Sequence, residues 1–266
     1  MKKLILILMA IIMITPSAIE ARTKGGKKAQ IVAHRGFWNC DEAGYAKNSI
    51  AALRCAQEAG FWGSEFDVNM TADSVLLVYH DSSIDGKPIE KYPYSEFKDI
   101  KIANGEYIPT IDEFLAQGKK HPETMLVYEL KSMSSAELEN TFVNLVVANL
   151  AENGLLNPNR VMFISFSLRM CTKLAEMLPG YTVQYLNSDK SPEELKALNI
   201  NGIDFHHELF VKNPTWYRQA RKNKMSVNAW TVNNEEDMAR MLKMGVDQLT
   251  TDNPLEATAL NEKINR

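Results

Sequence analysis

The most constraining feature of the sequence is an alternation of short apolar runs with longer amphipathic segments along most of its length. Several of these runs are continuously apolar, as in parallel strands that are covered on both faces. The eight predicted strands are Ile31–His34, Gly63–Val68, Leu126–Leu130, Val161–Ser165, Thr182–Leu186, Asn201–Phe205, Ser226–Trp230 and Val246–Thr250. Eight strands separated by helices predict an α/β fold, the TIM (β/α)8 barrel.

Short motifs predict where several of the intervening helices begin. Three stretches fit the capping box, in which a Ser or Thr hydroxyl and a Glu three residues later cap each other's backbone. They are Thr110-Ile111-Asp112-Glu113, Ser134-Ser135-Ala136-Glu137 and Ser191-Pro192-Glu193-Glu194. Asn213-Pro214 and Asn253-Pro254 each place a capping residue before a proline at the first helical position.

One further run, Val75–His80, does not fit the barrel count. Only a few residues separate it from Val68, whereas a parallel neighbour needs a connection of about a dozen or more residues. We therefore predict that Glu65–His80 is an antiparallel hairpin that returns His80 to the neighbourhood of Asp67. Residues 81–109 are then a small insertion over the C-terminal face of the barrel, after the second strand.

The N-terminus has the pattern of a secretory signal peptide. Lys2 and Lys3 precede an apolar run, Leu4–Ile14, which is followed by small residues. The run is too short to span a membrane, which takes about 20 apolar residues. Cleavage could follow Ala18 or Ala21. The predicted division is a signal peptide at 1–21, a basic linker at 22–29 and one barrel domain at 30–266, exported to the periplasm or secreted.

Composition excludes several classes of protein. Of 266 residues 45% are hydrophobic and 24% charged, the balance of a folded globular chain. With 30 Lys and Arg against 33 Asp and Glu, there is no basic excess for nucleic-acid binding. The three cysteines match no zinc pattern, and their odd number leaves at least one unpaired, so we infer no disulfide framework.

Reactive side chains gather where the predicted strands end, the position at which barrels of this kind carry their chemistry. Glu65 and Asp67 are two residues apart on one strand and so share a face, as do Glu129 and Lys131. Three converging carboxylates would repel one another unless a hard cation, Ca²⁺ or Mg²⁺, neutralised them. The alternative is separate surface carboxylates that pair with lysines.

Two histidines and two permanent cations lie at the same strand ends. His34 and His80 carry imidazoles whose unperturbed pKa of about 6.5 suits proton transfer at neutral pH. Arg35 and Lys131 could hold an anionic oxygen. A cation site, an acid/base pair and anion-binding groups together favour a phosphate ester over a neutral substrate.

In this order the motifs resemble those of the glycerophosphodiester phosphodiesterase family. The resemblance rests on His34-Arg35-Gly36, Asn48-Ser49, Glu65-Phe66-Asp67, His80-Asp81, Glu129-Leu130-Lys131, Ser165-Phe166, Asn228–Asn233 and Gly245–Pro254, and it spans about Ile31 to Leu255. Each motif alone is weak, but the ordered set is specific.

The resemblance implies a TIM-barrel hydrolase that cuts glycerophosphodiesters to glycerol 3-phosphate and an alcohol with one divalent cation, Ca²⁺ or Mg²⁺. The resemblance implies that Glu65, Asp67 and Glu129 are metal ligands and that His34 and His80 are the acid and base. It implies that Arg35 and Lys131 bind the phosphate and that Trp230 lines the glycerol side of the pocket. The alternative for Trp230 is a purely structural role, in which its ring packs against the core at the rim of the barrel. Which histidine is the acid, and whether water or a substrate hydroxyl attacks first, stay open.

The chain departs from the family pattern at Lys47, where a Glu is usual, and in the short segment that follows His80-Asp81. Two alternatives therefore remain. One is a binder of glycerophospho head groups that does not cleave them, and the other is a related phosphodiesterase that acts on intact phospholipids. In each case we expect a small-molecule or head-group ligand, no nucleic acid and no stable membrane insertion, and the oligomeric state stays open.

Overall fold

Eight parallel strands close into a barrel in the computed structural model, which describes residues 28–266. The strands are β1 (Gln30–Ala33), β2 (Gly63–Met70), β6 (Met125–Leu130), β7 (Val161–Ser165), β8 (Val183–Tyr185), β9 (Gly202–His206), β10 (Ser226–Trp230) and β11 (Gln248–Thr251). The ring closes because β1 pairs with β11 on one side and with β2 on the other. The predicted TIM barrel is confirmed, with each predicted strand present to within two residues at either end.

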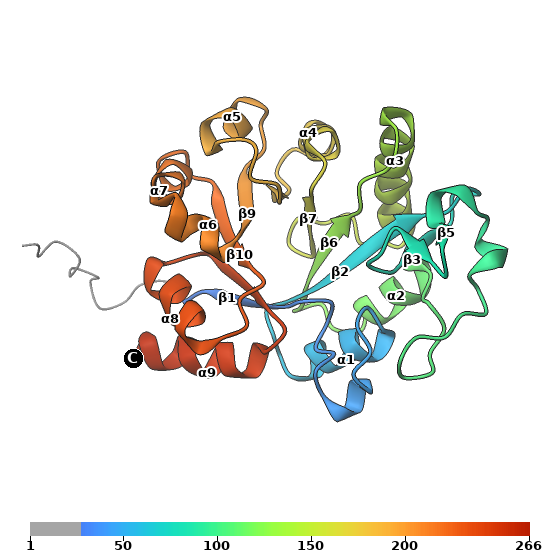
Figure 1. Ribbon diagram of the computed structural model, residues 1–266, viewed down its shortest axis with the longest axis horizontal. Helices are drawn as coiled ribbons and strands as arrows, with labels where there is room; N and C mark the ends of the chain where they lie inside the picture. The colour runs from blue at the N-terminus through green and yellow to red at the C-terminus, as the bar shows by residue number, and fades with distance from the viewer. Residues whose placement is uncertain (1–27) are drawn as a thin grey trace, which may run out of the picture.

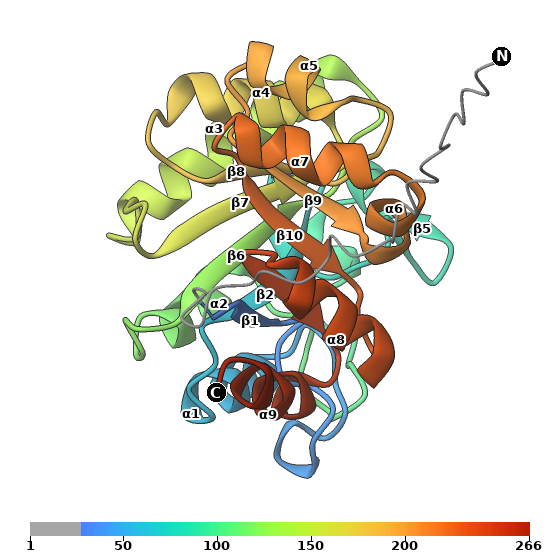
Figure 2. The same ribbon diagram turned by 90° about the vertical axis from the view of Figure 1, so that its left-hand side faces the viewer.

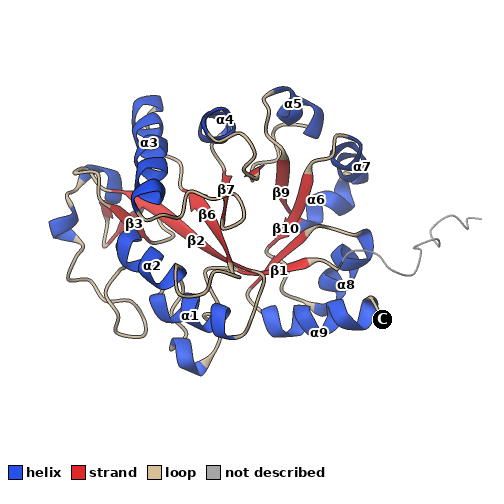
Figure 3. Cartoon of the chain, turned by 180° about the vertical axis from the view of Figure 1, so that it is seen from behind, coloured by secondary structure: helices blue, strands red, loops and turns tan. Residues whose placement is uncertain are grey.

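Helices surround the strands on the outside, as Figures 1 and 3 show. They are α1 (Ile50–Glu58), α2 (Ile111–Gly118), α3 (Ala136–Glu152), α4 (Leu168–Met177), α5 (Pro192–Ala197), α6 (His207–Lys212), α7 (Pro214–Lys222), α8 (Glu235–Met244) and α9 (Pro254–Ile264). Figure 2 shows α9 lying beside α1 and β1. There the Asn261 side chain donates a hydrogen bond to the carbonyl of Ala29, which ties the last helix to the first strand.

The helix starts are confirmed in part. Thr110 and Ser191 each form the predicted capping box. The box predicted at Ser134 is wrong, because Ser135 caps α3 and accepts from the backbone N–H of Leu138, which has no carboxylate to return the bond. The backbone N–H of Ser134 instead donates a hydrogen bond to the carboxylate of Glu90, which lies in a distant segment of the chain.

The two Asn-Pro sites place proline at the first helical position, as predicted, but neither asparagine side chain caps its helix. The Asn253 amide group instead donates to the carbonyl of Asn233, and its oxygen accepts from Asn39. These partners come from other loops, so tertiary contacts replace the local cap.

Apolar side chains pack against both the outer and the inner face of the barrel sheet. Outside, Phe66, Tyr128 and Phe163 on three neighbouring strands form a row of aromatic contacts, and Phe66 packs on Phe114 of α2 at 4.6 Å between ring centroids. Inside, a second cluster holds Val32, Val127, Met162, Ile164 and Leu186. The barrel below its mouth is thus a packed core.

The predicted hairpin is confirmed. Strand β3 (Leu76–Val78) pairs antiparallel with the end of β2, with Met70 opposite Leu76 and Val68 opposite Val78. Its turn is closed by the Thr71 hydroxyl, which donates to Asp73 and accepts from the N–H of Val75. This geometry brings the chain after β3 back to the mouth of the barrel.

The insertion after the hairpin contains a two-stranded sheet, β4 (Ser83–Ile84) and β5 (Lys87–Pro88), and the short 3₁₀ turns Ile89–Lys91 and Tyr94–Glu96. It has its own apolar cluster around Leu77, Ile89 and Phe97, and it lies at the outer side of the hairpin (Figure 1). The insertion therefore flanks the mouth of the barrel.

The predicted signal peptide, residues 1–21, and residues 22–27 of the predicted linker lie outside the described residues. Among the helices that the structure describes, none is both long and apolar enough to cross a lipid bilayer.

Candidate active site

Strand register places the predicted reactive groups on the inner face of the barrel. Asp67 of β2 and Glu129 of β6 are direct partners across the parallel pair, and so are Phe66 and Tyr128. Because side chains alternate along a strand, the aromatic pair that packs outward forces both carboxylates inward. The same alternation directs Glu65 and Lys131 to the inner side.

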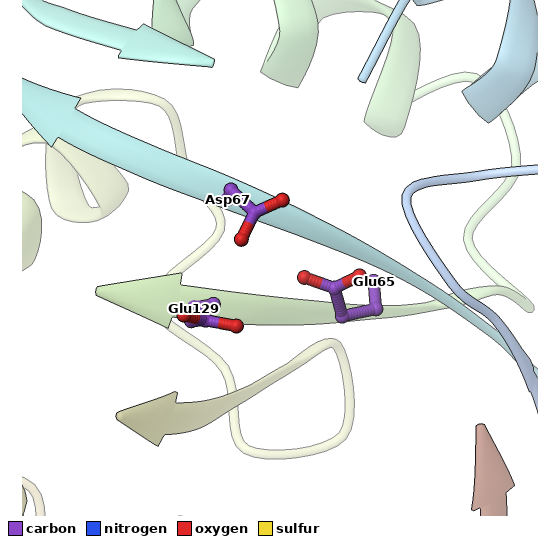
Figure 4. A group of neighbouring side chains, drawn as sticks. All are labelled: Glu65, Asp67 and Glu129. Atoms are coloured by element: carbon purple, nitrogen blue, oxygen red, sulfur yellow. The ribbon is translucent and has the colours of Figure 1, made fainter. Parts of the chain in front are cut away.

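Glu65, Asp67 and Glu129 form a buried acidic cluster, with one oxygen from each lying within 4.8 Å of the others. Figure 4 shows the three carboxyl groups gathered between β2 and β6. Burial, followed by the charges of Asp67 and Glu129, raises the pKa of Glu65 well above its usual range. Burial and Asp67 raise the pKa of Glu129 to about 7.

One oxygen of Glu65, Oε1, is buried without a hydrogen-bond partner. A buried carboxylate oxygen left unpaired is costly, and three clustered oxygen donors match the preference of a hard divalent cation. The acidic cluster therefore fits a divalent metal site.

Two cations flank the cluster on the side of Asp67. Lys131 Nζ lies 2.7 Å from Glu129 Oε1 and 3.2 Å from Asp67 Oδ1, and Arg35 Nε lies 3.5 Å from Asp67 Oδ2. Burial opposes ionisation of Asp67, but Lys131 and other neighbours, including a hydrogen bond from the buried Asn48, hold its pKa below the usual value. Within the acidic cluster, Asp67 is therefore the carboxylate most firmly held in its charged form.

His34 follows β1 and is oriented by an acid at the other end of the chain. Its Nδ1 lies 2.8 Å from Asp252 Oδ1, and its Nε2 lies 4.0 Å from Glu65 Oε2. Asp252 also accepts hydrogen bonds from Trp38 and Asn233. Burial works against ionisation of Asp252, but the bonds from these three side chains lower its pKa to about 2.

The turn after His34 has an unusual backbone. Arg35 and Gly36 both have positive φ, 57° and 79°. The N–H of Arg35 donates to Glu65 Oε2 at 2.7 Å, and the N–H of Gly36 donates to the Glu65 carbonyl. Only glycine fits the second position, because an added Cβ would lie 2.7 Å from Ala52 Cβ. The left-handed turn costs about 1–2 kcal/mol at Arg35 and aims two backbone donors at β2.

His80 returns to the mouth of the barrel on the hairpin. The Asn69 amide donates to the carbonyls of Tyr79 and Asp81, on either side of this histidine. His80 Nδ1 lies 2.6 Å from Asp81 Oδ1. Burial lowers the pKa of His80, although Asp67 opposes the shift.

These groups meet at one cavity of about 220 Å³ at the mouth of the barrel. It is lined by His34, Arg35, Glu65, His80, Glu129, Lys131, Ile164, Phe166, Leu186, Asp204, Trp230, Thr231 and Thr250. Seven of the eight predicted site residues line it, and the eighth, Asp67, lies behind them in contact with Lys131. No residue of the insertion lines the cavity, in keeping with its place beside the mouth.

Two acidic residues near the cavity, Asp252 and Asp204, are not among the site residues that the sequence predicts. Asp252 directly follows β11, so its place at a strand end was a usable signal. Asp204 lies inside β9 among apolar residues, with nothing local to single it out. Burial and then Glu129 raise the pKa of Asp204 well above its usual range.

Comparison with known proteins assigns the family. Residues 34–256 match the model of the glycerophosphoryl diester phosphodiesterase family. The chain belongs to this family. A glycerophosphodiester phosphodiesterase of Caldanaerobacter subterraneus is 30% identical over 244 residues, covering 85% of this chain and 95% of that protein. Family membership makes the chain a phosphoric diester hydrolase.

Solved structures of the family have the same fold. A glycerophosphodiester phosphodiesterase of Parabacteroides distasonis is 38% identical, with a TM-score of 0.87 over 91% of this chain and 100% of that one. An Oleispira antarctica phosphodiesterase, solved with the product sn-glycerol-3-phosphate, is 22% identical, with a TM-score of 0.74 over 88% of this chain and 97% of that one.

Lys47, the departure from the family pattern, lies outside the cavity. It is exposed, and its Nζ lies 4.4 Å from the centre of the Trp38 ring. The positive charge therefore stacks on an aromatic ring at the rim and does not enter the acidic cluster.

Proposed function

We propose that this glycerophosphodiester phosphodiesterase family member hydrolyses glycerophosphodiesters to sn-glycerol 3-phosphate and an alcohol, in a metal-dependent reaction with two catalytic histidines. The observation that carries the proposal is the meeting of two imidazoles, two cations and a buried acidic cluster at one cavity. The product bound to the Oleispira antarctica relative supports the choice of substrate.

Glu65, Asp67 and Glu129 would hold one divalent cation, Ca²⁺ or Mg²⁺, since all three offer oxygen ligands. Such a cation, when bound, draws negative charge from a phosphoryl oxygen. Arg35 and Lys131 lie beside the same carboxylates, where they would bind the remaining anionic oxygens. Trp230 lines the cavity and would bound the organic part of the substrate.

The two histidines would transfer the protons. Asp252 accepts from Nδ1 of His34, which leaves Nε2 toward the cavity as the atom that exchanges a proton. Asp81 binds Nδ1 of His80 in the same way. One imidazole would take the proton of the attacking hydroxyl while the other protonates the leaving alkoxide.

The test measures glycerol 3-phosphate release from glycerophosphocholine with Ca²⁺ or Mg²⁺ and with chelator. His34→Ala and His80→Ala should each lower kcat by about 10²–10⁴-fold, the contribution of general acid/base catalysis. His121→Ala, a loop histidine outside the cavity, is the matched control and should keep full activity. Full activity in both cavity variants, or no loss with chelator, would refute the proposed mechanism.

The same assay separates the two alternatives. A binding protein would retain glycerophosphocholine in equilibrium dialysis and release no glycerol phosphate. A phosphodiesterase that acts on intact lipids would hydrolyse phosphatidylcholine vesicles faster than the soluble diester.

We also propose, from the sequence pattern alone, that residues 1–21 direct export and that residues 30–266 form the mature catalytic domain. Sequencing the N-terminus of the protein from periplasm or culture medium is the test. A start at Ile19 or Arg22 would support the proposal, whereas an intact Met1 in the cytoplasm would contradict it.

A further inference from the structure

We propose that Asp204 is a specificity-determining residue, whose carboxyl group binds the distal hydroxyl of the substrate's glycerol moiety, the one farthest from the phosphate. The inference rests on the proposed function, because it assumes that a phosphodiester occupies the cavity. It assigns a role to a carboxyl group that the proposed acid/base and metal chemistry does not use.

Strand order places Asp204 opposite the acidic cluster. Going round the barrel in either direction, β9 is four strands away from β2, through β6, β7 and β8 or through β1, β11 and β10. Asp204 therefore faces Glu65 and Asp67 across the mouth. It lines the cavity and is not one of the three acidic residues whose oxygens cluster within 4.8 Å.

The Asp204 carboxyl group has an unfilled hydrogen-bonding position. The residue is 1% exposed, and its Oδ1 has no hydrogen-bond partner. Buried polar atoms in folded proteins are nearly always paired, so an unpaired one at a cavity wall points to a ligand. A carboxyl oxygen can accept the proton of a hydroxyl group.

Neighbouring groups hold Asp204 in position. The indole N–H of Trp230 donates to the Asp204 carbonyl at 2.8 Å, which links the aromatic wall of the cavity to this residue. On the other side, the side chain of Asn228, the strand partner of Asp204, exchanges hydrogen bonds with Thr250. The bond from Trp230 thus fixes the backbone that carries the Asp204 side chain, and support of this kind helps to preorganise a binding group.

The distance from the phosphate along the glycerol moiety indicates which hydroxyl group Asp204 would bind. If the phosphate sits at the acidic cluster with Arg35 and Lys131, only the part of the glycerol remote from phosphorus reaches the opposite wall. The hydroxyl next to the ester carbon stays close to the phosphate, where it could act as a nucleophile. The distal hydroxyl is the one left for Asp204.

The experiment compares two substrates, glycerophosphocholine and 2-hydroxypropyl phosphocholine, which lacks only the distal hydroxyl. The wild type should prefer the first by about tenfold or more in kcat/KM, because a site built to bind a hydroxyl discriminates against the analogue that lacks it. Asp204→Ala should lose this preference by slowing glycerophosphocholine hydrolysis while leaving 2-hydroxypropyl phosphocholine nearly unchanged. Asp204→Asn, whose amide oxygen can still accept, should retain part of the preference.

A second measurement does not require turnover. Inhibition by glycerol 3-phosphate and by 2-hydroxypropyl phosphate should differ in the wild type and converge in Asp204→Ala. Thermal unfolding of each variant identifies any loss caused by misfolding, and if Asp204→Ala does not fold, the Asn variant decides.

The outcomes separate this inference from the proposed function. Equal loss on both substrates in the variants would give Asp204 a purely structural role and overturn the inference, while hydrolysis by the wild type would still support the proposed function. Absence of hydrolysis by the wild type with either cation would refute the proposed function and, with it, this assignment.

Discussion

His34 Nδ1 lies 2.8 Å from Asp252 Oδ1, a contact between residues 218 positions apart in the chain. It exists because the barrel closes: His34 follows the first strand, Asp252 follows the last, and β1 and β11 are neighbours. Since Asp252 also accepts from Trp38 and Asn233, the imidazole is held in one orientation. Ring closure thus positions one of the two proposed catalytic histidines.

Replacing Asp252 with Asn should lower kcat by about 10–100-fold, the usual cost of removing a group that orients a functional histidine. KM should change little, because the substrate does not contact Asp252 in the proposed arrangement. Steady-state kinetics on glycerophosphocholine measures both constants. The control variant Asn39→Ala removes a neighbouring loop contact to Asn253 and should leave kcat nearly unchanged. Equal losses of kcat in the two variants would mean that only the stability of the loop matters.

Replacing Glu65 with Gln should leave the stability of the cation-free protein unchanged or raise it. The Glu65 carboxyl group is buried beside two other carboxylates, so its neutral analogue removes repulsion. The same variant should lose the gain in melting temperature that Ca²⁺ or Mg²⁺ gives the wild type. Glu139→Gln, which removes a buried acid paired with Arg169, should be destabilised yet keep that gain.

Cation affinity should weaken as the pH falls. Without a cation the pKa of Glu129 is raised to about 7, and a ligand carboxyl must lose its proton before it coordinates. Protons therefore compete below this pKa, and affinity should fall by up to about tenfold per pH unit from pH 7 to pH 6. Calorimetric titrations at these pH values test this, and a pH-independent affinity would show that Glu129 does not titrate at the site.

Gly36→Ala should destabilise the protein more than Gly60→Ala. Both glycines have positive φ, so each variant carries the left-handed penalty of about 1–2 kcal/mol. A Cβ at Gly36 would in addition meet the Ala52 side chain and backbone at 2.7 and 2.8 Å, whereas at Gly60 nothing lies within 4 Å. Urea unfolding gives the difference. Only Gly36→Ala should also reduce activity, because its turn carries His34 and Arg35.

Local sequence rules predicted much of the fold and of the site. Apolar runs located the strands, and the short spacing before Val75 predicted the hairpin that returns His80 to the cavity. Alternation along β2 and β6 correctly turned Glu65, Asp67 and Glu129 to one side. The rules failed at Ser134 and Asn253, where partners distant in the chain bind the groups that a local cap would have used. They failed also at Asn213, whose side-chain oxygen accepts from the Thr215 hydroxyl and not from a backbone N–H of the helix.

The amino-acid sequence by itself determined which residues form the strands, which side chains face inward and what chemistry they offer, because these properties depend on neighbours a few positions away. Only the tertiary structure decided which groups meet across the barrel. The pairing of His34 with Asp252, and the place of Asp204 opposite the acidic cluster, depend on strand order and ring closure. Those are set by packing among segments far apart in the chain, which no local pattern records.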